Sequence, residues 1–211
     1  MIKVEIISDF ACPWCYLGRK NLGKAISKLG EGIAVEIRWR PFQLSPELPL
    51  EGIDYRDYLV NKLGSESKLE SAWKHLTRLG ESAGINYHFE KITKAFNTLQ
   101  LHSIHQLEKD PTRQDELALR IFRAHFEDGL DFSDLEQTYS LLKDQFENRV
   151  AFEASWSNEM TANEVRQEIH YYRQNRISGV PLFIFQEKYS VGGAQPPEVF
   201  LEVLESILKE G

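Results

Sequence analysis

Two cysteines, Cys12 and Cys15, are the only thiols in the sequence, and Pro13 and Trp14 separate them. Such a pair can form a structural disulfide, bind a metal or exchange disulfides with a substrate. A disulfide that closes a loop of four residues removes little chain entropy, worth ~2 kcal/mol in the simple model. A stabilising role alone is therefore a weak explanation for the pair.

A zinc site would need two further ligands beyond the cysteines. The sequence has no second CxxC, and His102 and His105, at helical i,i+3 spacing, are the best remaining candidates. Histidines at this spacing are more often packed or solvated than metal-bound. We therefore expect no metal and favour redox exchange.

Two elements must position the cysteines. Residues 4–9 form a β-branched run typical of a strand, and from Pro13 onward the apolar residues follow a helical period. Cys12 would then lie just before the first helical turn, where the unpaired amides and the helix dipole stabilise a thiolate. Cys15, one turn inside the helix, would be more buried. An accessible attacking thiol and a shielded resolving thiol are what disulfide exchange requires.

The rest of the chain indicates the fold. Residues 34–42 alternate as a strand does, and a stretch with two prolines follows at 43–52. Helical periodicity then predicts helices near 54–63, 66–83, 97–109, 113–127, 133–145 and 161–176. Strands at 181–185 and 188–191 and a helix at 197–209 complete the pattern. This order predicts an α/β protein with a thioredoxin fold, in which a large all-helical insertion separates the βαβ and ββα halves.

The corresponding division is a thioredoxin-like domain at 1–45 and 176–211, with a helical insertion at 46–175 that ends in the crossover helix. In a thioredoxin fold, a cis proline precedes the first strand of the second half and packs beside the sulfurs. Val180 and Pro181 occupy that place, so we expect a cis bond there, and a substrate-binding backbone. The alternative is a trans proline that starts an edge strand.

The composition excludes some partners. A net charge of −7 and a pI near 5.5 argue against binding to nucleic acid or to an anionic membrane. The first ten residues lack a signal-peptide pattern, and no run has the ~18 apolar residues of a spanning helix. We expect a cytoplasmic protein, monomeric or homodimeric, in a compartment that keeps ordinary thiols reduced.

The sequence resembles the DsbA family of thioredoxin-fold oxidoreductases, in its FrnE-like branch. The resemblance is carried by SDFACPWCYLGRK, WRPFQLSP, AFNT, GVPLF and VGGAQ, in this order along nearly the whole chain. It implies a thiol-disulfide oxidoreductase that acts on protein or small-molecule thiols and disulfides without a bound cofactor. It also implies Cys12 as nucleophile, Cys15 as resolving thiol and Pro181 as the cis proline, with Pro13, Trp14 and Val180 beside the substrate.

The same branch contains 2-hydroxychromene-2-carboxylate isomerases and kappa-class glutathione transferases, which bind glutathione. Those relatives often have serine where this chain has Cys12, and an Asp-Arg or Asp-Ser pair where it has Ala194 and Gln195. A glutathione-dependent isomerase or transferase therefore remains the alternative, and glutathione remains a candidate co-substrate. Trp14 replaces the histidine of periplasmic DsbA, so we expect a less oxidising pair. A non-catalytic binding protein is a third hypothesis.

Asp9, three residues before Cys12, is a candidate proton relay, although a carboxylate after a strand can equally hold a turn. Several aromatic side chains could line a groove above the thiols. Core packing is the commoner role for each of them. These residues are Trp39, Phe42, Trp73, Phe96, Phe132 and Trp156.

Overall fold

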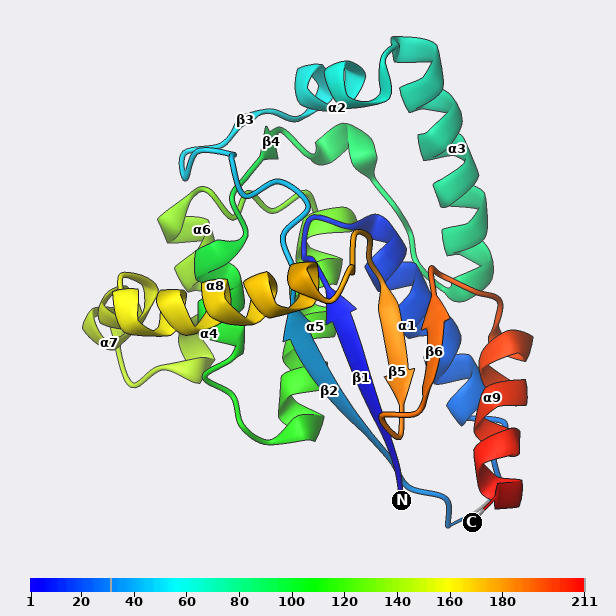
Figure 1. Ribbon diagram of the computed structural model, residues 1–211. Helices are drawn as coiled ribbons and strands as arrows, with labels where there is room; N and C mark the ends of the chain where they lie inside the picture. The colour runs from blue at the N-terminus through cyan, green and yellow to red at the C-terminus, as the bar shows by residue number, and fades with distance from the viewer. Residues whose placement is uncertain (31, 211) are drawn as a thin grey trace.

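The computed structural model describes residues 1–30 and 32–210. Its main sheet has four strands in the order β2-β1-β5-β6, formed by β1 (Ile2–Ser8), β2 (Val35–Pro41), β5 (Leu182–Phe185) and β6 (Tyr189–Gly192). β1 pairs in parallel with β2 and antiparallel with β5, and β5 pairs antiparallel with β6. The two ends of the chain thus meet in one sheet, as a thioredoxin fold requires (Figure 1).

Helix α1 (Pro13–Ile26) follows β1 directly and packs on the sheet beside α9 (Pro197–Glu210). Gly18 makes the close approach possible, because a Cβ at this position would lie 2.9 Å from the ring of Phe183 on β5. Val4 and Ile6 on β1 are fully buried between the layers. This packing fixes the start of α1 above the end of β1.

The segment between β2 and β5 is mostly helical, as predicted. Its helices are α2 (Tyr55–Leu63), α3 (Glu66–Ala83), α4 (Leu99–His105), α5 (Pro111–Phe126), α6 (Leu135–Leu142), α7 (Arg149–Trp156) and α8 (Glu159–Gln174), with 3-10 turns at Phe89–Lys91 and Lys143–Gln145. α5 and α8 contact β2, while α2 and α3 extend over the start of α1 (Figure 1). Of the described residues, no helix is long and apolar enough to cross a membrane.

Several details differ from the predicted elements, among them the end of α4 at His105 rather than near 109. β3 (Ile53–Asp54) and β4 (Lys94–Ala95) pair within the insertion, so it is not purely helical. α7 was not predicted: it spans only eight residues, Val150 is 73% exposed, and Phe152 is its one fully buried side chain. α5 begins two residues early, because Pro111 takes its first position and the Asp110 carboxylate accepts the Arg113 N–H.

Candidate active site

Cys12 and Cys15 lie at the junction of β1 and α1, as predicted. Cys12 is the residue that caps α1, Pro13 is the first helical residue, and the Cys15 N–H donates to the Cys12 carbonyl at 3.0 Å. The Cys12 N–H donates to the carbonyl of Asp9, also at 3.0 Å. Both thiols are free, and the two cysteines come within 3.6 Å of each other. This separation allows one sulfur to reach the other with little backbone movement.

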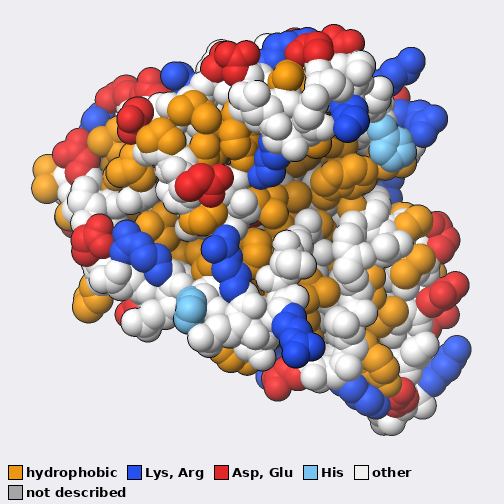
Figure 2. All heavy atoms as spheres, turned by 45° about the horizontal axis from the view of Figure 1, so that its top comes forward, with side chains coloured by type: hydrophobic (Ala, Val, Ile, Leu, Met, Phe, Trp, Pro, Cys, Tyr) orange, Lys and Arg blue, Asp and Glu red, His pale blue; other side chains and the backbone are white. Residues whose placement is uncertain are grey.

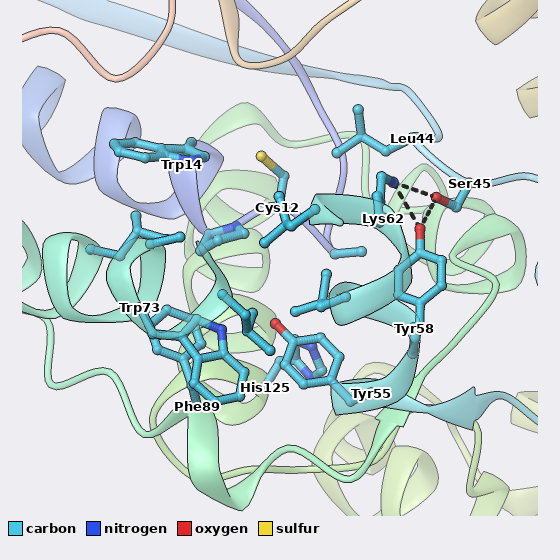
Figure 3. Close-up of a pocket in the computed structure, with 18 of the residues that line it drawn as sticks. Cys12, Trp14, Leu44, Ser45, Tyr55, Tyr58, Lys62, Trp73, Phe89 and His125 are labelled. Carbon is cyan, nitrogen blue, oxygen red and sulfur yellow. Dashed lines mark hydrogen bonds between the residues drawn. The ribbon is translucent and has the colours of Figure 1, made fainter. Parts of the chain in front are cut away.

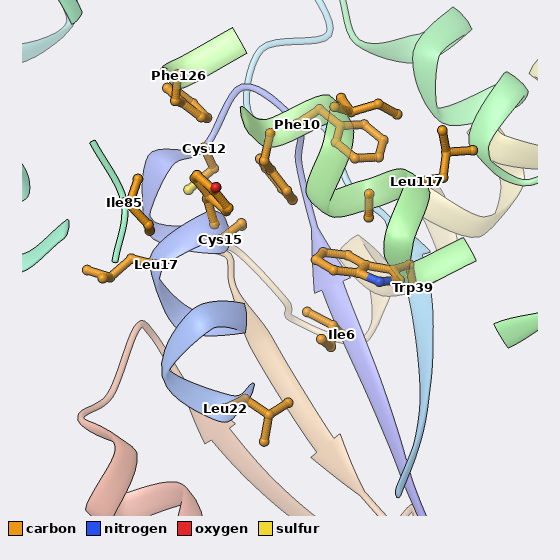
Figure 4. Packing of buried hydrophobic residues seen from close by; sticks show 14 of the residues in the cluster. Ile6, Phe10, Cys12, Cys15, Leu17, Leu22, Trp39, Ile85, Leu117 and Phe126 are labelled. Carbon is orange, nitrogen blue, oxygen red and sulfur yellow. The ribbon is translucent and has the colours of Figure 1, made fainter. Parts of the chain in front are cut away.

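The two thiols differ in environment, although less in exposure than the sequence suggests. Cys15 is fully buried and Cys12 is only 3% exposed, so the expected accessibility of Cys12 needs correction. Figure 4 shows both side chains among core residues such as Phe10 and Leu17. Burial raises the pKa of the Cys15 thiol well above its usual value, and the adjacent Cys12 raises it further. Cys15 therefore resists ionisation in its buried position.

The Val180–Pro181 segment lies against the first cysteine. The peptide bond between these residues is cis. The Cys12 thiol donates to the carbonyl of Val180 over a 3.7 Å S···O distance, and the Pro181 carbonyl accepts the Gly193 N–H at 2.8 Å. Residues 168 positions apart in sequence thus meet at the sulfur.

Asp9 is 1% exposed and makes local and long-range contacts. Its carboxylate accepts the N–H of Ala11 at 3.2 Å and that of Leu44 at 2.6 Å, so it holds the turn before α1 and fixes the loop after β2. The Nε2 atom of His102 lies 3.6 Å from Asp9 Oδ1 and makes no hydrogen bond within the described residues. The turn-holding interpretation of Asp9 is thus satisfied, and a buried titratable side chain faces it.

The two histidines considered for zinc are engaged elsewhere. His102 faces Asp9, and His105 Nε2 donates to the Gln114 carbonyl at 2.9 Å. Burial lowers the pKa of His105 to about 3, which keeps its ring neutral. Among residues 1–30 and 32–210, no group of three or more His, Cys, Asp or Glu side chains is arranged to hold a metal ion.

A cavity of about 220 Å³ opens beside Cys12, between the start of α1 and helices α2 and α3. Pro13 and Trp14 lie on its α1 side. Figure 2 shows hydrophobic side chains gathered in a hollow on this face of the molecule. Of the six aromatic residues considered for a groove, Trp73 and Phe96 line the cavity, and the other four pack elsewhere.

The sequence did not identify the polar group at this cavity. The ammonium of Lys62, on α2, donates to the hydroxyls of Tyr58 at 2.7 Å and Ser45 at 2.9 Å. The hydroxyls of Ser45 and Tyr58 also bond to each other, and all three side chains line the cavity (Figure 3). The i,i+4 spacing of Tyr58 and Lys62 gives one helical face, but nothing local indicates that this face points toward Cys12.

A family model described as a DSBA-like thioredoxin domain matches residues 3–205. The solved structure of a probable DsbA oxidoreductase from Streptomyces coelicolor is 29% identical, with a TM-score of 0.89, over 100% of this chain and 92% of that one. The Bacillus subtilis protein YwbO is 23% identical over 94% of both chains.

A further solved structure is a 2-hydroxychromene-2-carboxylate isomerase. It is 19% identical, with a TM-score of 0.73, over 99% of this chain and 95% of that one. At this identity the likeness concerns the fold.

Proposed function

Because the chain belongs to the family of DSBA-like thioredoxin domains, we propose that it is a thiol-disulfide oxidoreductase in which Cys12 attacks and Cys15 resolves. One observation supports this assignment most directly. Of the two thiols, Cys12 lines the cavity, and Cys15 lies behind it within 3.6 Å. A substrate sulfur can reach Cys12 from the cavity, and Cys15 is the thiol placed to attack Cys12 afterwards.

The reduction of a substrate then proceeds in two displacements. The Cys12 thiolate attacks one sulfur of the substrate disulfide, forms a mixed disulfide and releases the other sulfur as a thiolate. The Cys15 thiolate next attacks the Cys12 sulfur, releases the second substrate thiolate and leaves a Cys12–Cys15 disulfide. Two electrons pass from the protein to the substrate. Oxidation of a substrate dithiol is the same sequence in reverse.

The surrounding residues have roles that follow from their positions. Pro13 and Trp14 contact the substrate from the α1 side, while Val180 and Pro181 present backbone to it. The Val180 carbonyl now accepts the Cys12 thiol proton, and ionisation of Cys12 frees that carbonyl for a substrate N–H. Asp9 relays the proton that must leave Cys15, whose raised pKa makes proton loss the difficult part of the second step.

We place this reaction in the cytoplasm, with no bound cofactor and with glutathione as one candidate co-substrate. A measured reduction potential would give the direction of electron flow. A value near −270 mV, about that of thioredoxin, indicates a reductant, and one near −120 mV, about that of DsbA, an oxidant. The oligomeric state, monomer or homodimer, does not enter the reaction, because both cysteines come from one chain.

The test is a trapping experiment. Cys15→Ser should accumulate substrate on Cys12 as a mixed disulfide, whereas Cys12→Ser should accumulate almost none, because Cys15 is fully buried. Both variants would be recovered from cells after acid quenching and compared on non-reducing gels and by mass spectrometry. Equal trapping by the two variants, or none by a folded Cys15→Ser protein, would refute the mechanism.

A glutathione-dependent isomerase or transferase is the second candidate, in which the apolar cavity beside Cys12 would hold the organic substrate rather than glutathione. In that reaction Cys12 would not cycle through a disulfide with Cys15. Cys15→Ser would then retain full isomerase or transferase turnover, whereas a disulfide exchanger without Cys15 would depend on an external thiol to release each mixed disulfide. Glutathione titration followed by calorimetry, with Cys12→Ser as the control, would measure the binding itself.

A further inference from the structure

We propose that the cavity selects a small disulfide in which the sulfur carries an apolar, ring-sized group bearing a carboxylate, and that Lys62 binds the carboxylate. This inference rests on the proposed function, because the selected molecule is the substrate that Cys12 attacks. Three features of the cavity support it: the access to Cys12, the composition of the walls and one cation at the rim.

Access to Cys12 favours a small molecule over a folded protein. Only 3% of Cys12 is exposed, and this residue lies at the wall of an opening bounded by α2 and α3. Attack requires the Cys12 sulfur to approach the substrate disulfide along its S–S axis at near-contact distance. A disulfide held on a protein surface would have to bring its neighbouring chain into this opening, whereas a small disulfide enters alone.

The inner walls select for apolar rings. Tyr55 and Trp73 are stacked at 6.2 Å between ring centroids, Trp73 and Phe89 are stacked at 5.5 Å, and Leu69 and Leu76 complete this side. An engineered apolar cavity of ~150 Å³ is large enough to bind benzene. A volume of about 220 Å³ therefore accommodates one substituted ring. These walls give a polar peptide such as glutathione few hydrogen-bonding partners.

Lys62 supplies the charge at the rim. An ammonium has three N–H donors, and Ser45 and Tyr58 accept two of them. No carboxylate among the described residues lies within ion-pairing distance of Lys62, so the charge is not neutralised by the protein there. Figure 3 shows that the two hydroxyls hold the ammonium at the cavity that Cys12 also lines. A substrate carboxylate is the group that completes this arrangement.

The test uses reduced protein in single turnover, so no external reductant is needed. The probes are 4,4′-dithiodibenzoic acid and its uncharged diamide, and release of the aryl thiolates is followed by absorbance. Lys62→Met keeps the apolar stem and removes the charge. We expect it to lower the ratio of the dicarboxylate rate to the diamide rate by about threefold to fivefold, the upper end of the effect of one exposed ion pair. The effect should shrink at ~1 M salt, where screening is strong.

The control is Lys74→Met, on the exposed face of α3 and outside the cavity lining. It makes the same change of net charge, and we expect it to leave the ratio within about twofold of wild type at moderate salt. An unchanged ratio in Lys62→Met, or an equal fall in both lysine variants, would overturn the role of Lys62.

A cavity-filling variant tests the shape. Ala72→Phe, on the α3 wall, should slow the aryl disulfides more than the small, ring-free hydroxyethyl disulfide. Equal slowing of the two classes would overturn the cavity as the selecting feature, and so would faster reduction of insulin than of the aryl dicarboxylate by wild type. Failure of wild type to reduce any of these disulfides would instead refute the proposed oxidoreductase function.

Discussion

The cavity beside Cys12 has two walls that are built differently. One consists of consecutive residues at the start of α1, held by the sheet below and by the Cys12 N–H, which donates to the Asp9 carbonyl. The other gathers side chains from α2, α3, β4 and α5, held by stacked rings such as Tyr55 and Trp73. The first wall carries the sulfur chemistry on a rigid element. The second can change in shape and charge without disturbing that chemistry.

The largest expected effect is a difference in stability between the residues that support the two walls. Phe183 is fully buried beneath Gly18, and its ring centroid lies 4.7 Å from that of Phe200. Phe183→Ala should lower the free energy of unfolding by about 3–5 kcal/mol. Leu76→Ala, in a wall that already borders open space, should cost about 2 kcal/mol. Urea denaturation of both variants measures the difference, and a larger loss in Leu76→Ala would reverse the comparison.

The α1 side of the cavity could be predicted from the sequence because its determinants are local. The β-branched run before Cys12 and the proline after it specify a strand followed by a helix start, and the structure has both. Asp9 was also identified, because it lies three residues from Cys12. Its contact with Leu44 was not, because the loop after β2 reaches it only in the folded chain.

The opposite wall could not be predicted, for a physical reason. Lys62 is an exposed residue on a weakly amphipathic helix, where a charged side chain commonly faces solvent. Its relevance depends on how α2 packs over α1, and that packing is set by rings distributed between positions 55 and 132. His102 shows the same difficulty: its spacing from His105 indicated a packed or solvated side chain, and nothing local indicated that the fold turns it toward Asp9.

A second, smaller effect tests the α1 side alone. Asp9→Asn replaces one of two acceptor oxygens with an NH₂ group, which must then face a backbone N–H of Ala11 or Leu44. We expect a loss of about 1–3 kcal/mol in unfolding free energy. If Asp9 relays the proton of Cys15 as proposed, the mixed disulfide on Cys12 should also persist longer.

The lifetime of that mixed disulfide can be measured by rapid acid quenching and mass spectrometry. The matched control is Asp134→Asn, whose carboxylate also accepts two backbone N–H groups, at the exposed start of α6. It should destabilise the protein less and leave the lifetime unchanged. An unchanged lifetime in Asp9→Asn would remove the relay and leave Asp9 with its structural role.

A third prediction concerns the pH dependence of the unfolding free energy, to which one buried histidine in each region contributes. Burial lowers the pKa of His125, at the cavity, to about 4, and that of His105, near β2, to about 3. The unfolded chain, with a histidine pKa near ~6.5, binds these protons first. Stability is therefore fully present above pH ~6.5 and falls as the pH drops, by ~1.4 kcal/mol per pH unit for each ring.

His125→Phe should remove one such contribution, so that unfolding free energy measured in urea falls less steeply between pH 6 and pH 4.5. His105→Phe should do the same, and its wild-type contribution should continue to a lower pH, near 3. Each variant also loses a hydrogen bond to a carbonyl, Leu130 or Gln114, so stability at pH 7 will fall. The slope is the diagnostic quantity, and a slope unchanged by either substitution would mean that the ring is protonated or solvated in the folded protein.

The smallest effect concerns the hydroxyl that holds Lys62. Tyr58→Phe keeps the ring, over which the Lys62 ammonium lies 5.2 Å from the centroid, and removes one of its two oxygen partners. Because the site is at the rim, we expect unfolding free energy to change by less than about 1 kcal/mol. The ammonium becomes less fixed but keeps its charge. The ratio of dicarboxylate to diamide reduction should thus fall by only about twofold, less than in Lys62→Met. Ser45→Ala removes the other oxygen partner and should lower the ratio by the same amount as Tyr58→Phe. If either hydroxyl variant lowered the ratio as far as Lys62→Met does, the hydroxyls themselves would bind the carboxylate, and the cation would serve to orient them.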